Sequence, residues 1–324
     1  MPFSPVNASF EGFRVIKRAP VAVLLWCVIY LVLMAAIVAL IAAPMIQFAT
    51  SINQMAAYGG EPDPGQVFGL LAGYFGAMLL TVPVSLVGNA VFYAAVSRAV
   101  LRPEESAFGY IRFGGDELRL IVTNLVQGLV FGLIGVAVGI LFGVIFGIVA
   151  ASSSSSNSDP TAAVFAILGL QAVVWLVVTP LIIWIGIKLS LTTPIVIAEQ
   201  RIAIFDSWGR TKGRFWGLLG MGLLAYVLAT VISTLSAIII VPVFFLAGAG
   251  AFPILEQMDT ANTVDWQALM SAIGPAVVIC GVLLVVVSVL QAIVMIAPFS
   301  RAYLEIVEEA SGRAPPLDHE APLL

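Results

Sequence analysis

The run PVAVLLWCVIYLVLMAAIVALIAAPMIQF (residues 20–48) contains no Asp, Glu, Lys or Arg. A helix needs about 20 consecutive apolar residues to cross the hydrocarbon core of a bilayer. The run is also much longer than the apolar core of about 7–15 residues in a secretory signal peptide. We therefore expect it to form a transmembrane helix rather than a cleaved signal.

Five further runs of similar composition follow it along the chain. The six predicted transmembrane helices lie at about 20–48, 67–96, 118–150, 163–190, 215–249 and 272–298. The composition agrees, because 61% of the 324 residues are hydrophobic and 10% are charged, whereas soluble domains are about 25% charged. We predict an all-α polytopic membrane protein, with a single membrane domain over 1–310 and a disordered cytoplasmic tail over 311–324.

The positively charged residues fall in alternate connections between these helices. Every Lys and Arg lies in the N-terminal segment, near 98–119, near 188–214, or from 301 onward. The connections at about 49–66, 151–162 and 250–271 have none and carry acidic residues instead. Because Lys and Arg close to helix ends stay on the cytoplasmic side, we expect both termini in the cytoplasm and the protein in the inner membrane of a bacterium.

Three of the basic segments resemble one another. They read FEGFR (10–14), FGYIR (108–112) and FDSWGR (205–210). Each starts with Phe, has a second large apolar residue three positions later, and ends on Arg. The similarity predicts three repeated units, about 1–98, 99–196 and 197–304, each with a short interfacial helix followed by a helical hairpin. The alternative is a chance similarity in a chain of low complexity.

The short basic segments combine cations with aromatic residues, which is typical of helices that lie at a membrane surface. The i,i+3 spacing places the two large apolar residues of each segment on one helix face. The residues that we predict as interfacial anchors are Phe10, Phe13, Phe108, Phe205, Trp208 and Trp216. Arg210, Lys212 and Arg214 are candidates for binding a lipid headgroup or another anion, so membrane lipids are the first partners that we expect.

Lys188 is the only basic residue within a long apolar stretch, WLVVTPLIIWIGIKLSLTTPIVIA (175–198). A Lys at the centre of a bilayer costs about 2.5–3.5 kcal/mol on insertion scales. Asn89 and Gln291 lie at comparable places in the other two units, so the three side chains define a candidate polar site for a lipid phosphate or another anion. The alternative is a lysine that extends to the interface and two amides satisfied by hydrogen bonds.

One predicted helix carries a face of glycines. The stretch GVAVGILFGVIFG (135–147) places Gly135, Gly139, Gly143 and Gly147 at intervals of four residues. Such a face allows the backbone of another helix to approach closely. We expect it to pack against a helix of the same chain, and a homo-oligomer or another membrane protein is the alternative partner.

Few residues of the chain are suited to catalysis or to metal binding. His319 is the only histidine, and Cys27 and Cys280 lie in apolar runs, so we expect no metal, no cofactor and no disulfide. No nucleotide-binding GxxxxGK[ST] motif occurs, and nothing indicates nucleic acid as a partner. We predict no catalytic residue, and we interpret Glu199 and Asp206, beside the third basic segment, as members of local ion pairs or as helix caps.

The stretch IKLSLTTPIVIAEQRIAIFDSWGRTKGRFWGLLGMGLLAYVL (187–228) contains a recurring bacterial pattern. Its elements are Lys188, Pro194, Glu199, Ala203, Ser207, Trp208, Lys212, Gly213, Phe215 and Trp216. This pattern resembles the membrane domain associated with glycerophosphoryl diester phosphodiesterases and related six-helix inner-membrane proteins. The resemblance implies a stand-alone membrane module. It does not imply phosphodiesterase activity, because this chain lacks the clustered His, Glu and Asp ligands of the hydrolytic domain.

Three classes of function fit these observations to different degrees. A non-enzymatic module that binds lipid or a membrane partner agrees with the basic and aromatic segments and with the glycine face. A transporter or flippase-like carrier of an amphipathic molecule agrees with the repeats, but the predicted spans contain few polar groups. An enzyme acting on lipids would depend on Glu199 or Asp206. We therefore expect the first class.

Overall fold

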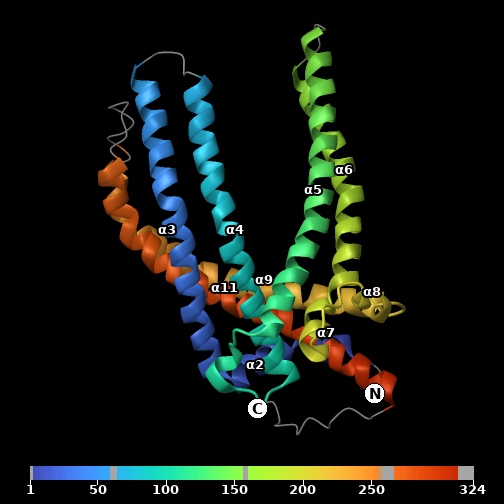
Figure 1. The fold of residues 1–324 in the computed structure, drawn as a ribbon. Coiled ribbons are helices and arrows are strands. Elements are labelled where there is room, and N and C mark those ends of the chain that lie inside the picture. The colour runs from blue at the N-terminus through green and yellow to red at the C-terminus, as the bar shows by residue number, and fades with distance from the viewer. Residues whose placement is uncertain (1–2, 59–63, 156–159, 255, 257–265, 313–324) are drawn as a thin grey trace.

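The computed structural model describes residues 3–58, 64–155, 160–254, 256 and 266–312, and within these ranges the chain forms helices and no strand (Figure 1). Six of the helices are long and apolar enough to cross a membrane. This agrees with the predicted all-α, multi-pass membrane protein. The long helices are α3 Pro20–Tyr58, α4 Pro64–Leu101, α5 Gly115–Ser155, α6 Pro160–Leu189, α9 Phe215–Ala247 and α11 Trp266–Ser311.

Each predicted span lies within one of these helices or overlaps nearly all of it, and most helices extend beyond the apolar run. Helix α3, for example, continues from Phe48 to Tyr58. A helix of 33 residues, the length of α9, measures about 50 Å at 1.5 Å per residue. Because the hydrocarbon core is about 30 Å thick, helices of this length can tilt or reach into the interface.

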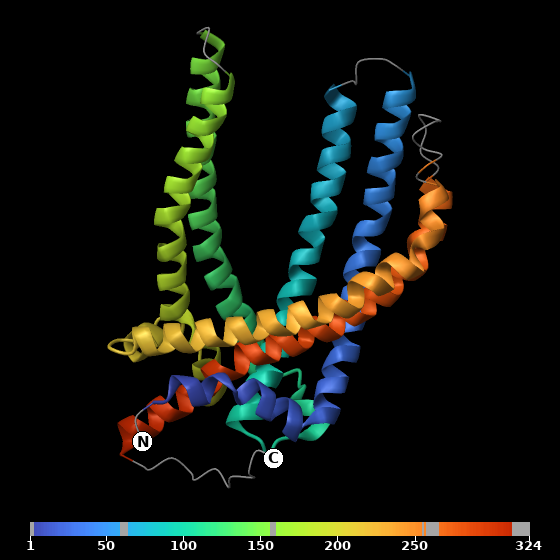
Figure 2. The same cartoon turned by 180° about the vertical axis from the view of Figure 1, so that it is seen from behind.

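Shorter elements connect the long helices. They are α1 Pro5–Ser9, α2 Glu11–Arg18, η1 Ala107–Tyr110, α7 Thr192–Glu199, α8 Asp206–Arg210 and η2 Ala249–Ala251. All but η2 lie at one end of the molecule, together with the C-terminal end of α11 (Figures 1 and 2).

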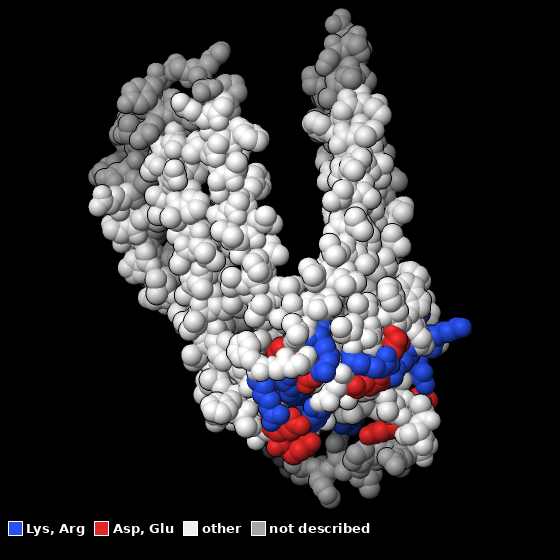
Figure 3. All heavy atoms as spheres, in the orientation of Figure 1, with Lys and Arg blue, Asp and Glu red and all other residues white. Residues whose placement is uncertain are grey.

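The long helices form three hairpins. The hairpins α3/α4 and α5/α6 rise from this shared end and diverge, while α9 and α11 run side by side and obliquely across it (Figures 1 and 2). The space-filling view shows a deep opening between the first two hairpins (Figure 3). The outer halves of these hairpins therefore contact few other parts of the chain, and most of their large apolar side chains are exposed.

The buried core lies where the three hairpins meet. Trp26 of α3 packs edge-on against Phe92 of α4, with ring centroids 5.9 Å apart, and Ile293 of α11 completes the same cluster. In this region Ser300 of α11 donates a hydrogen bond to Ser97 of α4 at 3.2 Å, and both side chains are fully buried. The fold is therefore held together at one end, because only there do all three hairpins bury apolar surface against one another.

The glycine face of α5 does not pack against another helix of the described chain. No described atom of another helix lies within 4 Å of a Cβ built at Gly135, Gly139, Gly143 or Gly147. The predicted contact of these glycines with a helix of the same chain is therefore not found among the described residues. The physical reason is the divergence of α5/α6 from α3/α4, which moves every potential neighbour except α6 away from α5 (Figure 1). A homo-oligomer or a partner protein stays a prediction.

Two further expectations need correction. The second basic segment is not a helix with Phe108 and Ile111 on one face, because Phe108 and Gly109 have positive φ angles of 50° and 63° within η1. The connection predicted at about 151–162 begins later than expected, because α5 continues to Ser155. The predicted disordered tail cannot be compared, since Ser311 ends α11 and 313–324 lie outside the described residues.

Candidate functional site

The charged side chains mark the end of the molecule where the short helices gather. On the face seen in Figure 3, Lys, Arg, Asp and Glu all lie at this end, which we call the charged base. It consists of α1, α2, η1, α7, α8, the last turns of α4 and α11, the first turns of α5 and the loops that join these elements. The predicted basic segments therefore come together in space, although they are about 100 residues apart in the sequence.

Arg98 is the most deeply buried charge of the base. It is 2% exposed, and its Nη2 lies 2.5 Å from Oε1 of Glu117 and 3.5 Å from Oδ2 of Asp116. Its Nη1 donates a hydrogen bond to the carbonyl oxygen of Tyr110 at 3.0 Å. Glu117 also accepts a bond from the backbone N–H of Gly114 at 2.9 Å. Because these charges are paired with one another, the cluster joins α4 to α5 and offers no free group to a ligand.

The loop between α4 and α5 is held in an uncommon backbone conformation. Phe108, Gly109 and Tyr110 all have φ between 50° and 65°, a region that costs energy for residues other than glycine. The indole N–H of Trp26 donates to the Gly109 carbonyl at 2.7 Å, and the Tyr110 hydroxyl donates to the Pro103 carbonyl at 3.1 Å. These bonds, with that of Arg98, hold the loop against the buried ends of α3 and α4.

A second ion-pair network joins α7, α8 and α11. Arg201 pairs with Glu199 at 2.7 Å and with Asp206, and Arg210 also pairs with Glu199. Tyr303 donates to Glu199 at 3.3 Å, and the Arg210 guanidinium lies 5.3 Å above the Tyr303 ring. The interpretation of Glu199 and Asp206 as members of ion pairs is confirmed.

The environment of Arg210 favours its charged form. Burial works against that form, but the contacts with Tyr303 and Glu199 raise the pKa of the guanidinium above its ordinary value. Arg210 is therefore a charge that the base itself neutralises. It is less suited to hold an external anion than a cation without an acidic neighbour.

The remaining candidate cations differ in their partners. Arg214 pairs with Glu309 of α11 at 3.0 Å. Lys212 is exposed, Lys188 is half-buried at the end of α6, and neither ammonium group has a hydrogen-bond or ion-pair partner within the described part of the chain. Of the predicted headgroup ligands, these two lysines keep the most capacity to bind an anion.

The predicted cluster of Lys188, Asn89 and Gln291 is not joined by hydrogen bonds between the described residues. Gln291 donates its amide N–H groups to the Ala229 carbonyl at 3.0 Å and to Ser233 Oγ at 2.5 Å, both on α9. Gln291 is therefore an amide whose hydrogen bonds are satisfied within the protein, which agrees with the alternative interpretation. Asn89 is half-buried on α4, and its role stays a prediction.

The aromatic residues predicted as anchors all expose much of their surface. The exposed residues are Phe10, Phe13, Phe108, Phe205, Trp208 and Trp216. Phe10 and Phe13 lie 6.3 Å apart between ring centroids, and Trp208 meets Trp184 of α6 edge-on at 5.1 Å. Exposed rings beside charges suit the boundary between water and lipid, although their contact with a membrane stays a prediction.

Ser207 fixes α8 against the junction of α6 and α7. Its hydroxyl donates to the Lys188 carbonyl at 2.7 Å and accepts from the Leu191 N–H at 3.2 Å, and the residue is fully buried. Sequence reasoning placed Ser207 in a recurring pattern without assigning it a role. The hydroxyl sets the position of α8, and thereby that of Arg210 and Lys212, relative to Lys188.

We expect Ser207→Ala to lower the free energy of unfolding by about 1–3 kcal/mol, because a buried N–H and a buried C=O lose their partner. Thermal unfolding in detergent measures the effect. Ser271→Ala is the control, since Ser271 is exposed and bonds only within its own helix. Equal unfolding temperatures for the two variants would contradict this role of Ser207.

No group of three or more His, Cys, Asp or Glu residues within the described ranges could hold a metal ion. Cys27 and Cys280 are free thiols. Comparisons with protein-family models, with curated proteins and with solved structures found no match to this chain. The resemblance to the membrane domain of glycerophosphoryl diester phosphodiesterases therefore stays a prediction.

Proposed function

We propose that this protein is a non-enzymatic, lipid-binding module of a bacterial inner membrane, with the charged base on the cytoplasmic side. The observation that carries the proposal is the divergence of two apolar hairpins above a base where most of the charges pair with one another (Figure 3). The apolar surface that these hairpins expose must be covered by other apolar groups, because large apolar patches are not stable in water. In a membrane, the acyl chains of lipids are the molecules present at that depth.

The orientation rests on the distribution of cations. Lys and Arg are absent from the predicted connections opposite the base, and cytoplasmic connections carry the excess of Lys and Arg in membrane proteins. Lys188 and Lys212 have no acidic partner in the described part of the chain, and a lysine binds phosphate as a compact charge. We propose these two residues as contacts for the phosphate of an anionic headgroup.

Three repeated units remain part of the proposal. The motifs VSRAVL (96–101) and FSRAYL (299–304) end the first and third units, and their serines, Ser97 and Ser300, bond to each other in the core. Contact between equivalent residues is what a repeat arranged about a common axis produces. The short elements before each hairpin, α2, η1 and α8, occupy corresponding places in the chain order.

Native mass spectrometry of the protein in mild detergent tests lipid binding. We expect retained phosphatidylglycerol in the unmodified protein and an affinity about 30-fold lower in Lys188→Ala/Lys212→Ala, because each of the two cations contributes about 1 kcal/mol near an anionic phosphate. Arg14→Gln is the matched control, since Arg14 already pairs with Glu11 and Asn7. Absence of any retained phospholipid in the unmodified protein would contradict the proposal.

One observation favours a carrier as the second candidate. The opening between α3/α4 and α5/α6 reaches down to the charged base (Figure 3), so an amphipathic molecule could enter it from the bilayer. Transfer of a fluorescent phospholipid between the leaflets of reconstituted vesicles distinguishes the two functions. If the transfer rate equals that of protein-free vesicles, the protein binds lipid but does not transport it. Because Glu199 and Asp206 are held in ion pairs, we propose no hydrolytic role for them.

A further inference from the structure

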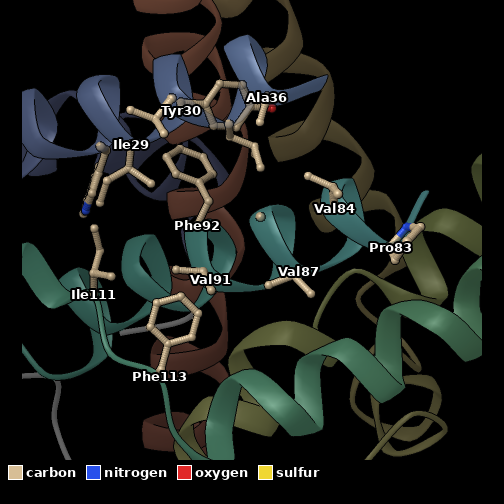
Figure 4. A pocket seen from close by; sticks show the side chains of 14 residues that line it. Ile29, Tyr30, Ala36, Pro83, Val84, Val87, Val91, Phe92, Ile111 and Phe113 are labelled. Atoms are coloured by element: carbon tan, nitrogen blue, oxygen red, sulfur yellow. The ribbon is translucent and has the colours of Figure 1, made fainter. Parts of the chain in front are cut away.

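A half-open pocket of about 570 Å³ lies between α3 and α4, next to the loop that precedes α5 (Figure 4). Its volume falls within the range of about 300–1,000 Å³ that is usual for small-molecule sites. Residues of α3 form one wall, residues of α4 form the other, and Ile111 and Phe113 of the loop close the end toward the charged base. No charged residue lines it.

The walls of the pocket are held in place by features already described. Trp26 packs on Phe92 and bonds to the Gly109 carbonyl, so the loop that carries Ile111 and Phe113 is tied to α3. Gly88 of α4 faces Leu33 of α3, and a Cβ at Gly88 would collide with the Leu33 side chain. Pockets built on fixed elements are suited to binding because little ordering is needed when a ligand enters.

The chemistry of the lining selects a hydrocarbon ligand. The only polar side-chain groups of the lining are the indole N–H of Trp26, which is already bonded to Gly109, and the hydroxyl of Tyr30. A polar molecule would lose its hydrogen bonds to water and find almost no replacement. A hydrocarbon chain makes no hydrogen bonds to water and therefore loses none on entering the pocket.

The length of the pocket agrees with one leaflet of a bilayer. On α3 the lining runs from Trp26 to Ala36, eleven residues separated by ten steps, which is about 15 Å at 1.5 Å per step. This is half of the hydrocarbon thickness of about 30 Å. The pocket begins beside the charged base and therefore covers the depth of the leaflet on that side.

A cation lies at the end where a headgroup would be placed. Arg112 stands between the lining residues Ile111 and Phe113, its side chain is 47% exposed, and it pairs with Glu105 at 2.9 Å. The ring of Phe113 is 82% exposed beside it. The pair with Glu105 uses only Nη1 of Arg112, and the other N–H groups of a guanidinium can donate to a phosphate. An aromatic ring at this depth suits the region between headgroups and acyl chains.

We propose that this pocket binds one acyl chain of a phospholipid from the leaflet next to the charged base, with the phosphate beside Arg112. The inference rests on the proposed lipid-binding function and adds the site. It concerns α3, α4 and the loop 107–113, and it does not involve Lys188 or Lys212. The two sites can therefore be tested separately.

Photocrosslinking of the full chain in vesicles tests the inference. The vesicles contain phosphatidylethanolamine and phosphatidylglycerol, with a small share of phosphatidylglycerol that carries a diazirine within one acyl chain. We expect crosslinks, mapped by mass spectrometry, to be enriched at Leu33, Val87 and Val91 over Val28 and Val82. The last two residues are exposed on the same helices and do not line the pocket.

Filling the pocket should abolish this enrichment. Val87→Trp places a large side chain in the pocket, and we expect crosslinking at Leu33 and Val91 to fall to the level of the exposed positions. Val82→Trp is the matched control on α4 and should keep the enrichment. Val84→Trp, at another lining position, replaces Val87→Trp if that variant does not reach the membrane folded.

The outcomes separate this inference from the proposed function. Uniform crosslinking along both helices, with phospholipid still retained in native mass spectrometry, overturns the pocket and leaves lipid binding intact. The same experiment with a free fatty acid that carries the diazirine tests the occupant. Enrichment with the fatty acid but not with phosphatidylglycerol overturns the phospholipid as occupant. Loss of retained phospholipid from the unmodified protein overturns the proposed function itself. Enrichment that Val87→Trp removes and Val82→Trp keeps supports the site.

Discussion

Replacing Arg98 by alanine is expected to lower the free energy of unfolding by about 3–5 kcal/mol, the usual cost of removing one partner from a buried ion pair. Glu117, which is 3% exposed, would lose its main counter-ion. The carbonyl of Tyr110 would also lose a donor. Thermal or denaturant unfolding in detergent measures the change, and loss of the folded protein from membranes is the extreme form of the same result.

Two controls isolate the buried charge from the loss of a side chain. Arg14→Ala removes a pair with Glu11 in which the Arg14 side chain is 42% exposed, and exposed pairs contribute about 0–1 kcal/mol. Arg98→Met/Glu117→Gln removes both charges, while the glutamine can still accept the N–H of Gly114. We expect the double variant to recover much of the stability lost in Arg98→Ala. An unfolding midpoint of Arg98→Ala equal to that of Arg14→Ala would show that the cluster is not stabilising.

The Arg98 cluster also bears on the pocket. Arg98 holds the Tyr110 carbonyl, and Ile111 and Phe113 follow directly in the chain and close one end of the pocket. Arg98→Ala should therefore weaken acyl-chain crosslinking at Leu33 as well as stability. Val87→Trp changes the pocket and leaves this ion pair in place, so the two variants separate loop position from pocket volume.

The second large effect is expected at Gly12, where α2 touches the backbone of α11. A Cβ at this position would lie 2.5 Å from Cα of Val294 and 3.1 Å from the carbonyl oxygen of Ile293. Backbone atoms inside a long helix cannot move away as a side-chain tip can. We expect Gly12→Ala to cost about 1–3 kcal/mol through overpacking, measured as a lower unfolding temperature in detergent.

Gly209 provides a matched control for this substitution. It lies in α8, another short helix of the charged base, and no described atom of another element lies within 4 Å of a Cβ built there. Because alanine is a better helix former than glycine by about 1 kcal/mol, Gly209→Ala should be neutral or slightly stabilising. If both variants unfolded at the same temperature, close approach of α2 to α11 would not be important for stability.

The six membrane helices could be predicted from the sequence because their signal is local. A run such as 20–48 is apolar whatever its neighbours are, and its backbone hydrogen bonds are satisfied within the helix. The pairing of Glu199 with Arg201 could also be predicted from local sequence, because the two residues are two positions apart. The gathering of the basic segments at one end followed from the alternation of charge along the chain.

The buried pair of Arg98 and Glu117 could not be predicted in the same way. The residues are 19 positions apart and meet because the loop between them turns through three left-handed residues. Burial, and not residue type, separates this pair from the exposed pair of Arg14 and Glu11. The repeat of Arg98 in VSRAVL and Arg301 in FSRAYL was the one signal that could have directed attention to it.

Hydropathy and charge along the chain are enough to predict six long apolar helices with cations on alternate connections. Both are properties of short stretches, set by hydropathy and by charge near helix ends. Three features became visible only in the folded chain: the glycine face of α5 has no described neighbour, Gln291 bonds within its own hairpin, and α3, α4 and the following loop enclose a pocket. These features depend on the angles between hairpins, because apolar side chains pack against one another without the directional bonds that would encode a partner in the sequence.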